Sequence, residues 1–178
     1  LSRQAAKFGP SLLMLLDQDE TGIFNISKEL QSKFPNLKIQ SLVKDITDHK
    51  SIKDIFSQHK PNVVFHAAAY KHVPLMEQNS DEAVKNNIFG TKNVTDASLE
   101  HGVEKFIFIS TDKAINPTSI MGATKRIGEM ICQAMSQNDK TSFISVRFGN
   151  VLNSRGSVIP IFKEQIRRGG PVEVTHPD

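Results

Sequence analysis

The sequence predicts an α/β domain with a doubly wound parallel sheet, on the basis of two observations. Short apolar runs of strand length alternate with longer stretches of helical periodicity, which is typical of parallel sheets covered by helices on both faces. Turn-forming residues separate the two kinds of stretch, as at Pro35, Pro61 and Gly102. With 178 residues, 38% of them hydrophobic, the chain can form one core.

The same patterns place each element in order. A helix is expected over residues 1–8. Strands are expected near residues 11–16, 37–42, 62–66, 105–109 and 142–146. Helices are expected between them, near residues 22–34, 48–59, 80–101 and 120–136. After Asn150 we expect a helix that reaches about residue 168 and a sixth strand over residues 171–175.

The ends of the sequence indicate a piece of a longer polypeptide. The chain opens in a helical stretch that Gly9 and Pro10 close, and a doubly wound sheet does not usually begin in this way. The other end stops in a turn at residues 176–178. We therefore expect a core over residues 1–150 that is truncated at its start, and the beginning of a second, smaller region over residues 151–178.

Composition excludes several classes of protein. The 22 Lys and Arg residues are scattered among 19 Asp and Glu residues, so the net charge of +3 forms no basic stripe, and nucleic acid is not expected as a partner. The single cysteine, Cys132, lies in an apolar helical pattern, which favours core packing and a reducing, cytoplasmic environment. No apolar run approaches the ~20 residues that cross a bilayer. The six histidines form no metal-binding pattern, so no metal is expected.

In parallel sheets, ligands bind beyond the carboxyl ends of the strands, and polar residues follow the first two strands. An acid at Asp17 can accept hydrogen bonds from both ribose hydroxyls of an adenine nucleotide, and its charge disfavours a 2'-phosphate, which favours NAD over NADP. Asp45 and Ile46 follow the second strand, where an adenine ring could contact them. Asp17 and Asp45 could instead cap the helices that come next.

The third and fourth strands are followed by two further candidate segments. Small side chains at Ala67, Ala68 and Ala69 would let a flat cofactor approach the backbone, although small residues also serve helix packing. The fourth strand runs directly into Thr111, Asp112 and Lys113. An adjacent acid and base could act as general acid and general base if both face one substrate. An exposed turn is the alternative.

Five ordered motifs resemble those of a known family. They are residues 66–77 (HAAAYKHVPLME), 86–91 (NNIFGT), 110–114 (STDKA), 121–125 (MGATK), and 147–150 (RFGN) with 155–160 (RGSVIP). The sequence resembles the capsule and O-antigen type UDP-N-acetylglucosamine 4,6-dehydratases, a branch of the extended short-chain dehydrogenase/reductase family, over essentially its whole length. The resemblance implies a Rossmann-like dinucleotide-binding core over residues 1–150, NAD as cofactor and a UDP-sugar as substrate. It also implies that a glycine-rich loop precedes the segment matching Leu1 and that a substrate-binding region continues past Asp178.

The resemblance also implies a role for each catalytic candidate. Lys113 would remove the hydrogen at sugar carbon 5, and Asp112 would protonate the departing hydroxyl at carbon 6. Thr111 would hydrogen-bond the hydroxyl at carbon 4, and Lys125 would bind the nicotinamide ribose. Met121 stands where short-chain dehydrogenases usually have a tyrosine, and a thioether cannot take a proton. The membrane-associated dehydratase branch resembles this sequence in having Met at that position. With no tyrosine there, we hypothesise that Asp112 receives the first proton.

Supporting residues complete the predicted site. Lys71 and His72 are expected to meet the substrate phosphate or sugar, and Asn150 and Arg155 the nucleotide diphosphate; solvated loops and turns are the alternatives. Asn87 is expected to brace the backbone of the active site beside the cofactor.

The resemblance further implies a homo-oligomer formed through the helices at residues 80–101 and 120–136, in a parent protein at the inner face of a bacterial cytoplasmic membrane. Two other functions stay open. A nucleotide-sugar epimerase or reductase of the same family would share the sheet and the cofactor, but would normally keep the tyrosine and would not need the adjacent Asp112 and Lys113. A noncatalytic dinucleotide-binding or assembly module would use the same two helices for self-association.

Overall fold

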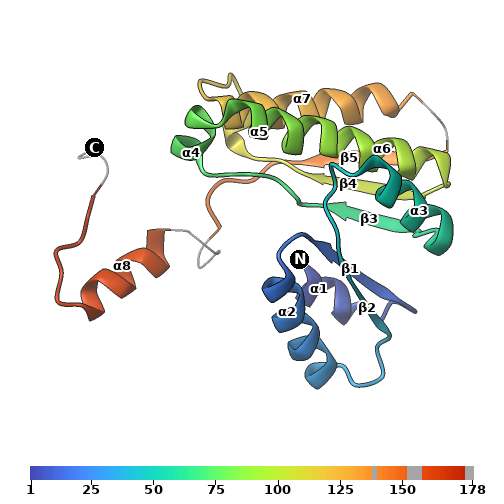
Figure 1. The fold of residues 1–178 in the computed structure, drawn as a ribbon, viewed down its shortest axis with the longest axis horizontal. Helices are drawn as coiled ribbons and strands as arrows, with labels where there is room; N and C mark the ends of the chain where they lie inside the picture. The colour runs from blue at the N-terminus through green and yellow to red at the C-terminus, as the bar shows by residue number, and fades with distance from the viewer. Residues whose placement is uncertain (138–139, 152–157, 175–178) are drawn as a thin grey trace.

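The computed structural model describes residues 1–137, 140–151 and 158–174. Within them, five strands form two parallel sheets, one of order β1-β2 and one of order β3-β4-β5 (Figure 1). Helices connect successive strands and pack on the sheets, which confirms the predicted α/β class with parallel strands.

The first sheet joins β1 (Leu13–Asp17) to β2 (Ile39–Val43) in parallel. The helices α1 (Ser2–Lys7) and α2 (Glu20–Lys33) pack against it. Apolar side chains from these elements meet in a small core of their own, and α2 begins where its N-cap aspartate accepts a hydrogen bond from the backbone of the first turn. The buried members of this core are Ala6, Leu15, Ile23 and Leu30.

The second sheet contains β3 (Val63–His66), β4 (Lys105–Ile109) and β5 (Ser142–Val146), all parallel. Phe106 and Phe108 point to one face of β4 and are fully buried. That face is covered by three packed helices, as Figure 1 shows: α3 (His49–His59), α6 (Thr91–Glu100) and α7 (Ile120–Met135). Cys132 is buried in the same core, as predicted.

The sheet is divided because no described strand lies between β1 and β3. Each of these two strands pairs on one side only, β1 with β2 and β3 with β4. The face of the second sheet opposite its helices is also open: Val63, Phe65 and Ile144 are 45%, 50% and 41% exposed.

The predicted helix over residues 80–101 is interrupted. It consists of α5 (Ser80–Val84), a π-helical turn η1 (Lys85–Gly90) and α6. A π-helical turn holds one extra residue in a helix and is frequent at functional sites. A further short helix, α4 (Val73–Gln78), precedes α5 and was not predicted; Pro74 lies in its first turn, where proline is tolerated.

The C-terminal part agrees only partly with the prediction. The expected helix is present as α8 (Val158–Arg167). The predicted sixth strand is wrong over residues 171–174, which form no regular structure; a strand needs a hydrogen-bonded neighbour, and no described strand pairs with this segment. Thr175 lies outside the described residues. Among the described helices, none is both long and apolar enough to cross a bilayer.

Candidate active site

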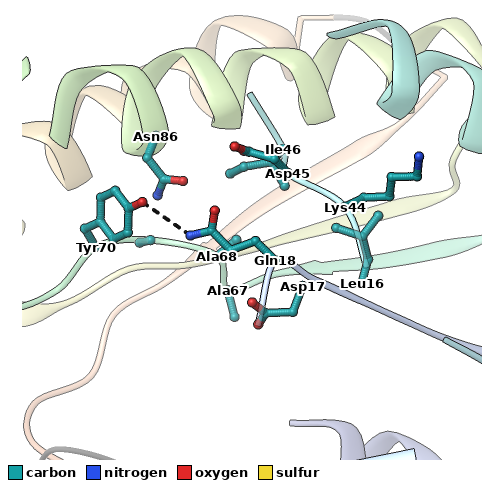
Figure 2. A pocket seen from close by; sticks show the side chains of 11 residues that line it. Leu16, Asp17, Gln18, Lys44, Asp45, Ile46, Ala67, Ala68, Tyr70 and Asn86 are labelled. Carbon is teal, nitrogen blue, oxygen red and sulfur yellow. Dashed lines mark hydrogen bonds between the residues drawn. The ribbon is translucent and has the colours of Figure 1, made fainter. Parts of the chain in front are cut away.

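A cavity of about 150 Å³ lies where the carboxyl ends of β1, β2 and β3 converge (Figure 2). Its lining contains every cofactor residue that was predicted at these three strand ends. The lining residues are Leu16, Asp17, Gln18, Lys44, Asp45, Ile46, Ala67, Ala68, Ala69, Tyr70 and Asn86. The structure thus brings together residues up to 70 positions apart in the sequence, because parallel strands end at one edge of the fold.

The two acids in the cavity are not helix caps. Asp17 accepts a hydrogen bond from the backbone N–H of Asp19 at 3.0 Å, and it is Asp19 that caps α2. In the same way, Asp45 accepts from the backbone N–H of Thr47 at 2.8 Å, while Asp48 caps α3. Each carboxylate is therefore held by one local hydrogen bond and stays directed at the cavity edge.

Side chains also link the segments that surround the cavity. The Gln18 amide donates to the Tyr70 hydroxyl at 3.3 Å, across the space between the loops after β1 and β3 (Figure 2). Ile46 is buried against Gly90, where an added Cβ would lie 2.5 Å from its Cδ1 atom. The Asn93 amide donates to the Ile46 carbonyl oxygen at 3.0 Å. These contacts fix the loop after β2 to the helical layer.

Asn87, in the π-helical turn, lies outside the cavity lining and is 1% exposed. Its Oδ1 atom accepts from the backbone N–H of Tyr70 at 2.8 Å, and its Nδ2 atom donates to the Tyr70 carbonyl at 3.0 Å. The same Nδ2 atom donates to Thr124 Oγ1 at 3.0 Å. Asn87 therefore ties the loop after β3 to α7, and the π-helical turn is what presents it there.

The catalytic candidates after β4 form one hydrogen-bonded group. The short 3-10 helix η2 (Asp112–Ala114) begins at Thr111, whose hydroxyl donates to Asp112 Oδ1 at 2.7 Å. The Lys113 ammonium donates to the same oxygen at 3.2 Å. The hydrogen bond from Thr111, followed by that from Lys113, holds the pKa of Asp112 below its usual value. Both charged side chains are about half exposed.

This protonation state is the reverse of the one that the predicted roles need. An acid must hold its proton and a base must have lost it, whereas the structure pairs an Asp112 carboxylate with a Lys113 ammonium. The pair lies outside the lining of the cavity described above. The predicted roles therefore require a transfer of one proton within the pair before reaction.

The segment after β5 runs beside this pair. The Asp112 backbone N–H donates to the Phe148 carbonyl oxygen at 3.2 Å, and Gly149 faces the Asp112 carboxylate. Asn150 follows and is exposed. Of the other predicted substrate residues, Lys71 and His72 are exposed just before α4, and Arg155 lies outside the described residues.

The two predicted residues on α7 are both buried. Met121 is 4% exposed in an apolar cluster with Met76 and Ala83, against which the only tyrosine, Tyr70, also packs. Lys125 follows one turn later, 6% exposed, and burial lowers its pKa to about 8. Met121, which the resemblance placed where short-chain dehydrogenases usually have a tyrosine, is thus a core side chain.

Sequence reasoning missed Glu129, a buried carboxylate on α7 that lies one helical turn after Lys125. The available signal was a charged residue within the apolar pattern of residues 127–135. In the described part of the chain, no group of three or more His, Cys, Asp or Glu residues could hold a metal ion.

Comparison with known proteins assigns the family. The model of the family described as polysaccharide biosynthesis protein matches residues 1–178. The chain belongs to this family. The resemblance that the five motifs indicated is thereby confirmed.

Three relatives illustrate the range of names in this group. Capsular polysaccharide biosynthesis protein CapD of Staphylococcus aureus is 52% identical over 100% of this chain and 30% of its own length. UDP-N-acetylglucosamine 4,6-dehydratase (inverting) of Campylobacter jejuni is 38% identical over 91% of this chain and 48% of its own length. UDP-glucose 4-epimerase of Rickettsia rickettsii is 39% identical over 84% of this chain and 44% of its own length. The chain thus spans half or less of each relative.

A solved structure shows the same fold. The X-ray structure of Pen from Bacillus thuringiensis matches with a TM-score of 0.85 and 37% sequence identity, over 93% of this chain and 50% of that chain. The Rossmann-like α/β fold predicted from the sequence is therefore confirmed.

Proposed function

We propose that the chain is the catalytic core of an NAD-dependent nucleotide-sugar 4,6-dehydratase that converts UDP-N-acetylglucosamine to a UDP-4-keto-6-deoxy sugar for bacterial surface polysaccharide. The observation that carries this proposal is the hydrogen-bonded group of Thr111, Asp112 and Lys113 at the end of β4, in a family member that is 38% identical to a protein named for this reaction. Residues 1–150 form the dinucleotide-binding core in this proposal, and residues 151–178 begin the substrate-binding region.

The cavity at the ends of β1 to β3 suits the adenosine part of a dinucleotide. Ala67, Ala68 and Ala69 leave the backbone accessible to a flat ligand, and Asp17 offers a carboxylate that caps no helix. A carboxylate at this place accepts from ribose hydroxyls and repels a 2'-phosphate, which supports NAD over NADP. When bound, NAD would accept hydride from sugar carbon 4 and return it to carbon 6.

The protein side of the reaction begins with the ion pair. Lys113 and Asp112 share a hydrogen bond of 3.2 Å, so one proton can pass from the ammonium to the carboxylate. A sugar that covers the pair would favour this transfer, because charges lose stability when water is excluded. The resulting amine of Lys113 takes the proton at carbon 5, and the resulting acid of Asp112 gives its proton to the hydroxyl that leaves carbon 6. Thr111 holds the hydroxyl at carbon 4, and Lys125 holds the nicotinamide ribose.

The deciding experiment incubates the complete gene product that contains this chain with UDP-N-acetylglucosamine and NAD. We expect a product lighter by one water, without net accumulation of NADH. An epimerase, which the Rickettsia relative raises as the second candidate, would give a product of unchanged mass. Binding of NAD without any turnover would indicate the noncatalytic module. Either of these two results would contradict the proposal.

We also propose that the protein self-associates through η1 and α7. Apolar side chains on these two elements are exposed: Phe89 is 60%, Ile127 40% and Met130 54% exposed. Light scattering of the wild-type protein and of Met130→Glu tests this, because a charge in the contact would dissociate the oligomer. An unchanged mass in the variant would argue against this contact.

A further inference from the structure

The carboxylate of Glu129 is the most highly connected charged group in the described residues around the candidate site. Its side chain is 6% exposed. Oε1 accepts from the Ser110 hydroxyl at 2.6 Å and from Arg147 Nε at 2.7 Å, and Oε2 accepts from Arg147 Nη2 at 2.6 Å and from Arg126 Nη1 at 3.0 Å. The bidentate pair with Arg147, more than any other contact, lowers the pKa of Glu129 to about 2, so the carboxylate is ionised.

Two of the three partners of Glu129 are the residues that directly follow two neighbouring strands. Ser110 directly follows β4, and Arg147 directly follows β5. The backbone continues the pairing beyond them: Ser110 N–H donates to the Val146 carbonyl at 2.8 Å, and Asp112 N–H donates to the Phe148 carbonyl at 3.2 Å. Asp112 therefore lies two residues past a side chain that Glu129 holds, and its backbone is bonded to the residue after Arg147.

The helix that carries Glu129 also carries Lys125, one turn earlier. Near its start, α7 lies so close to the catalytic segment that a Cβ on Gly122 would be 2.4 Å from the Lys113 carbonyl oxygen. Glu129 thus lies on the one helix that contacts the catalytic segment and contains the buried lysine. Its carboxylate fixes the distance between that helix and the ends of β4 and β5.

We propose that Glu129 is a positioning residue, which sets the place of Asp112 and Lys113 relative to Lys125 by binding Ser110 and Arg147 at once. This inference rests on the proposed function only for the roles of the positioned residues. The link itself is a property of the fold, and a purely stabilising ion pair is the alternative.

The test uses Glu129→Gln in the complete gene product, with Glu29→Gln as the matched control. Glu29 also binds an arginine through two hydrogen bonds, from Arg3, and a second cation, Lys33, but it lies on α2 away from the site. Two quantities are measured: amide hydrogen exchange at Ser110 and Asp112, whose N–H groups donate to the carbonyls of Val146 and Phe148, and the separate values of kcat and KM for the nucleotide sugar.

We expect Glu129→Gln to speed exchange at both amides about tenfold and to lower kcat about tenfold or more, with KM changed less than about threefold. The control should alter neither quantity. A purely stabilising role would lower the unfolding temperature of Glu129→Gln, more than that of the exposed control, and leave kcat of the folded enzyme unchanged, which would overturn the proposal.

If Glu129→Gln fails to fold, Ser110→Ala removes one hydrogen bond and keeps both arginine contacts. It should then speed exchange at Ser110 and Asp112, and equal rates with the wild type would overturn the proposal. If the wild-type protein shows no turnover, the proposed function fails, whereas the exchange rates still decide whether Glu129 positions the two segments.

Discussion

Lys125 places its ammonium nitrogen 4.2 Å from the centroid of the Phe108 ring, inside the core between α7 and β4. Both side chains are almost fully buried. The aromatic face attracts the cation, while the loss of water around it lowers the pKa of Lys125 to about 8. A charged residue is thus kept in the core at a cost in stability, as is common where a side chain serves a site rather than the fold.

Lys125→Met should stabilise the protein at neutral pH. A pKa lowered from 10.5 to about 8 corresponds to about 3 kcal/mol, which the attraction to Phe108 reduces, so we expect a gain of about 1–2 kcal/mol at pH 7. Between pH 8 and 10.5 the unfolded chain holds more protons than the folded one, so wild-type stability rises with pH and the gain shrinks. Urea unfolding at pH 7 and pH 10 measures both values. Lys28→Met, at an exposed lysine 4.9 Å from the Phe24 ring, should show no such dependence.

Gly122→Ala should disturb the catalytic segment. Its Cβ would lie 2.4 Å from the Lys113 carbonyl oxygen, a backbone atom that cannot rotate away, so α7 or η2 must shift. We expect a loss of about 1–3 kcal/mol in the free energy of unfolding, measured by urea titration, together with a lower rate of dehydration. Gly149→Ala is the control, because its Cβ would meet its nearest neighbour at 3.7 Å. Equal stabilities of the two variants would contradict the clash.

His66 should make the protein sensitive to mild acid. Its ring is buried, and burial followed by the charge of Lys125 lowers its pKa from 6.5 to about 3. Because the Thr91 hydroxyl donates to the Asn87 carbonyl, it accepts from His66, which places the proton of the neutral ring on Nε2. Between pH 6.5 and 3 the unfolded chain binds a proton that the folded chain excludes, so stability falls as the pH falls.

As the pH falls from 7 to 4.5, the free energy of unfolding should decrease less in His66→Gln than in the wild type, by roughly 2 kcal/mol or more. At pH 7 the variant should itself be less stable, because the ring stacks on Phe108 with centroids 5.8 Å apart. His59→Gln, at a partly exposed histidine, should leave the profile unchanged. An identical pH slope for His66→Gln and the wild type would contradict this assignment.

Asp112→Asn should lower the rate of water elimination about 100-fold or more, since the amide cannot deliver a proton to the leaving hydroxyl. If Asp112 also receives the first proton, the variant should slow hydride transfer from carbon 4 as well. The transient absorbance of NADH measures the rate of that step. If Asp112→Asn loses water elimination but keeps the wild-type rate of hydride transfer, Asp112 does not receive the first proton. Asp96→Asn, at an exposed Asp–Lys pair on α6, is the matched control and should leave both steps unchanged.

The strand ends and their convergence were predictable, because apolar runs mark parallel strands and such strands share one carboxyl edge. That reasoning placed Asp17, Asp45 and Ala68 at one edge of the fold, where they line one cavity, and their contact with a cofactor stays a prediction. The protonation state of Asp112 was not predictable, since it depends on hydrogen bonds to Thr111 and Lys113 whose geometry no spacing reveals. The role of Glu129 was hidden for a similar reason, because its partners are 18 and 19 residues away on separate strands.

The π-helical turn also escaped prediction, because one extra residue leaves the apolar pattern of a helix almost unchanged. Because of this turn, the side chains of α5 are rotated about the helix axis relative to those of α6. A single extra residue therefore sets the direction in which the α5 side chains point. Deletion of one residue there would turn α5 by roughly 100° about its axis relative to α6. Natural length variation should therefore be rarer in this short stretch than its single charged residue would lead a protein engineer to assume.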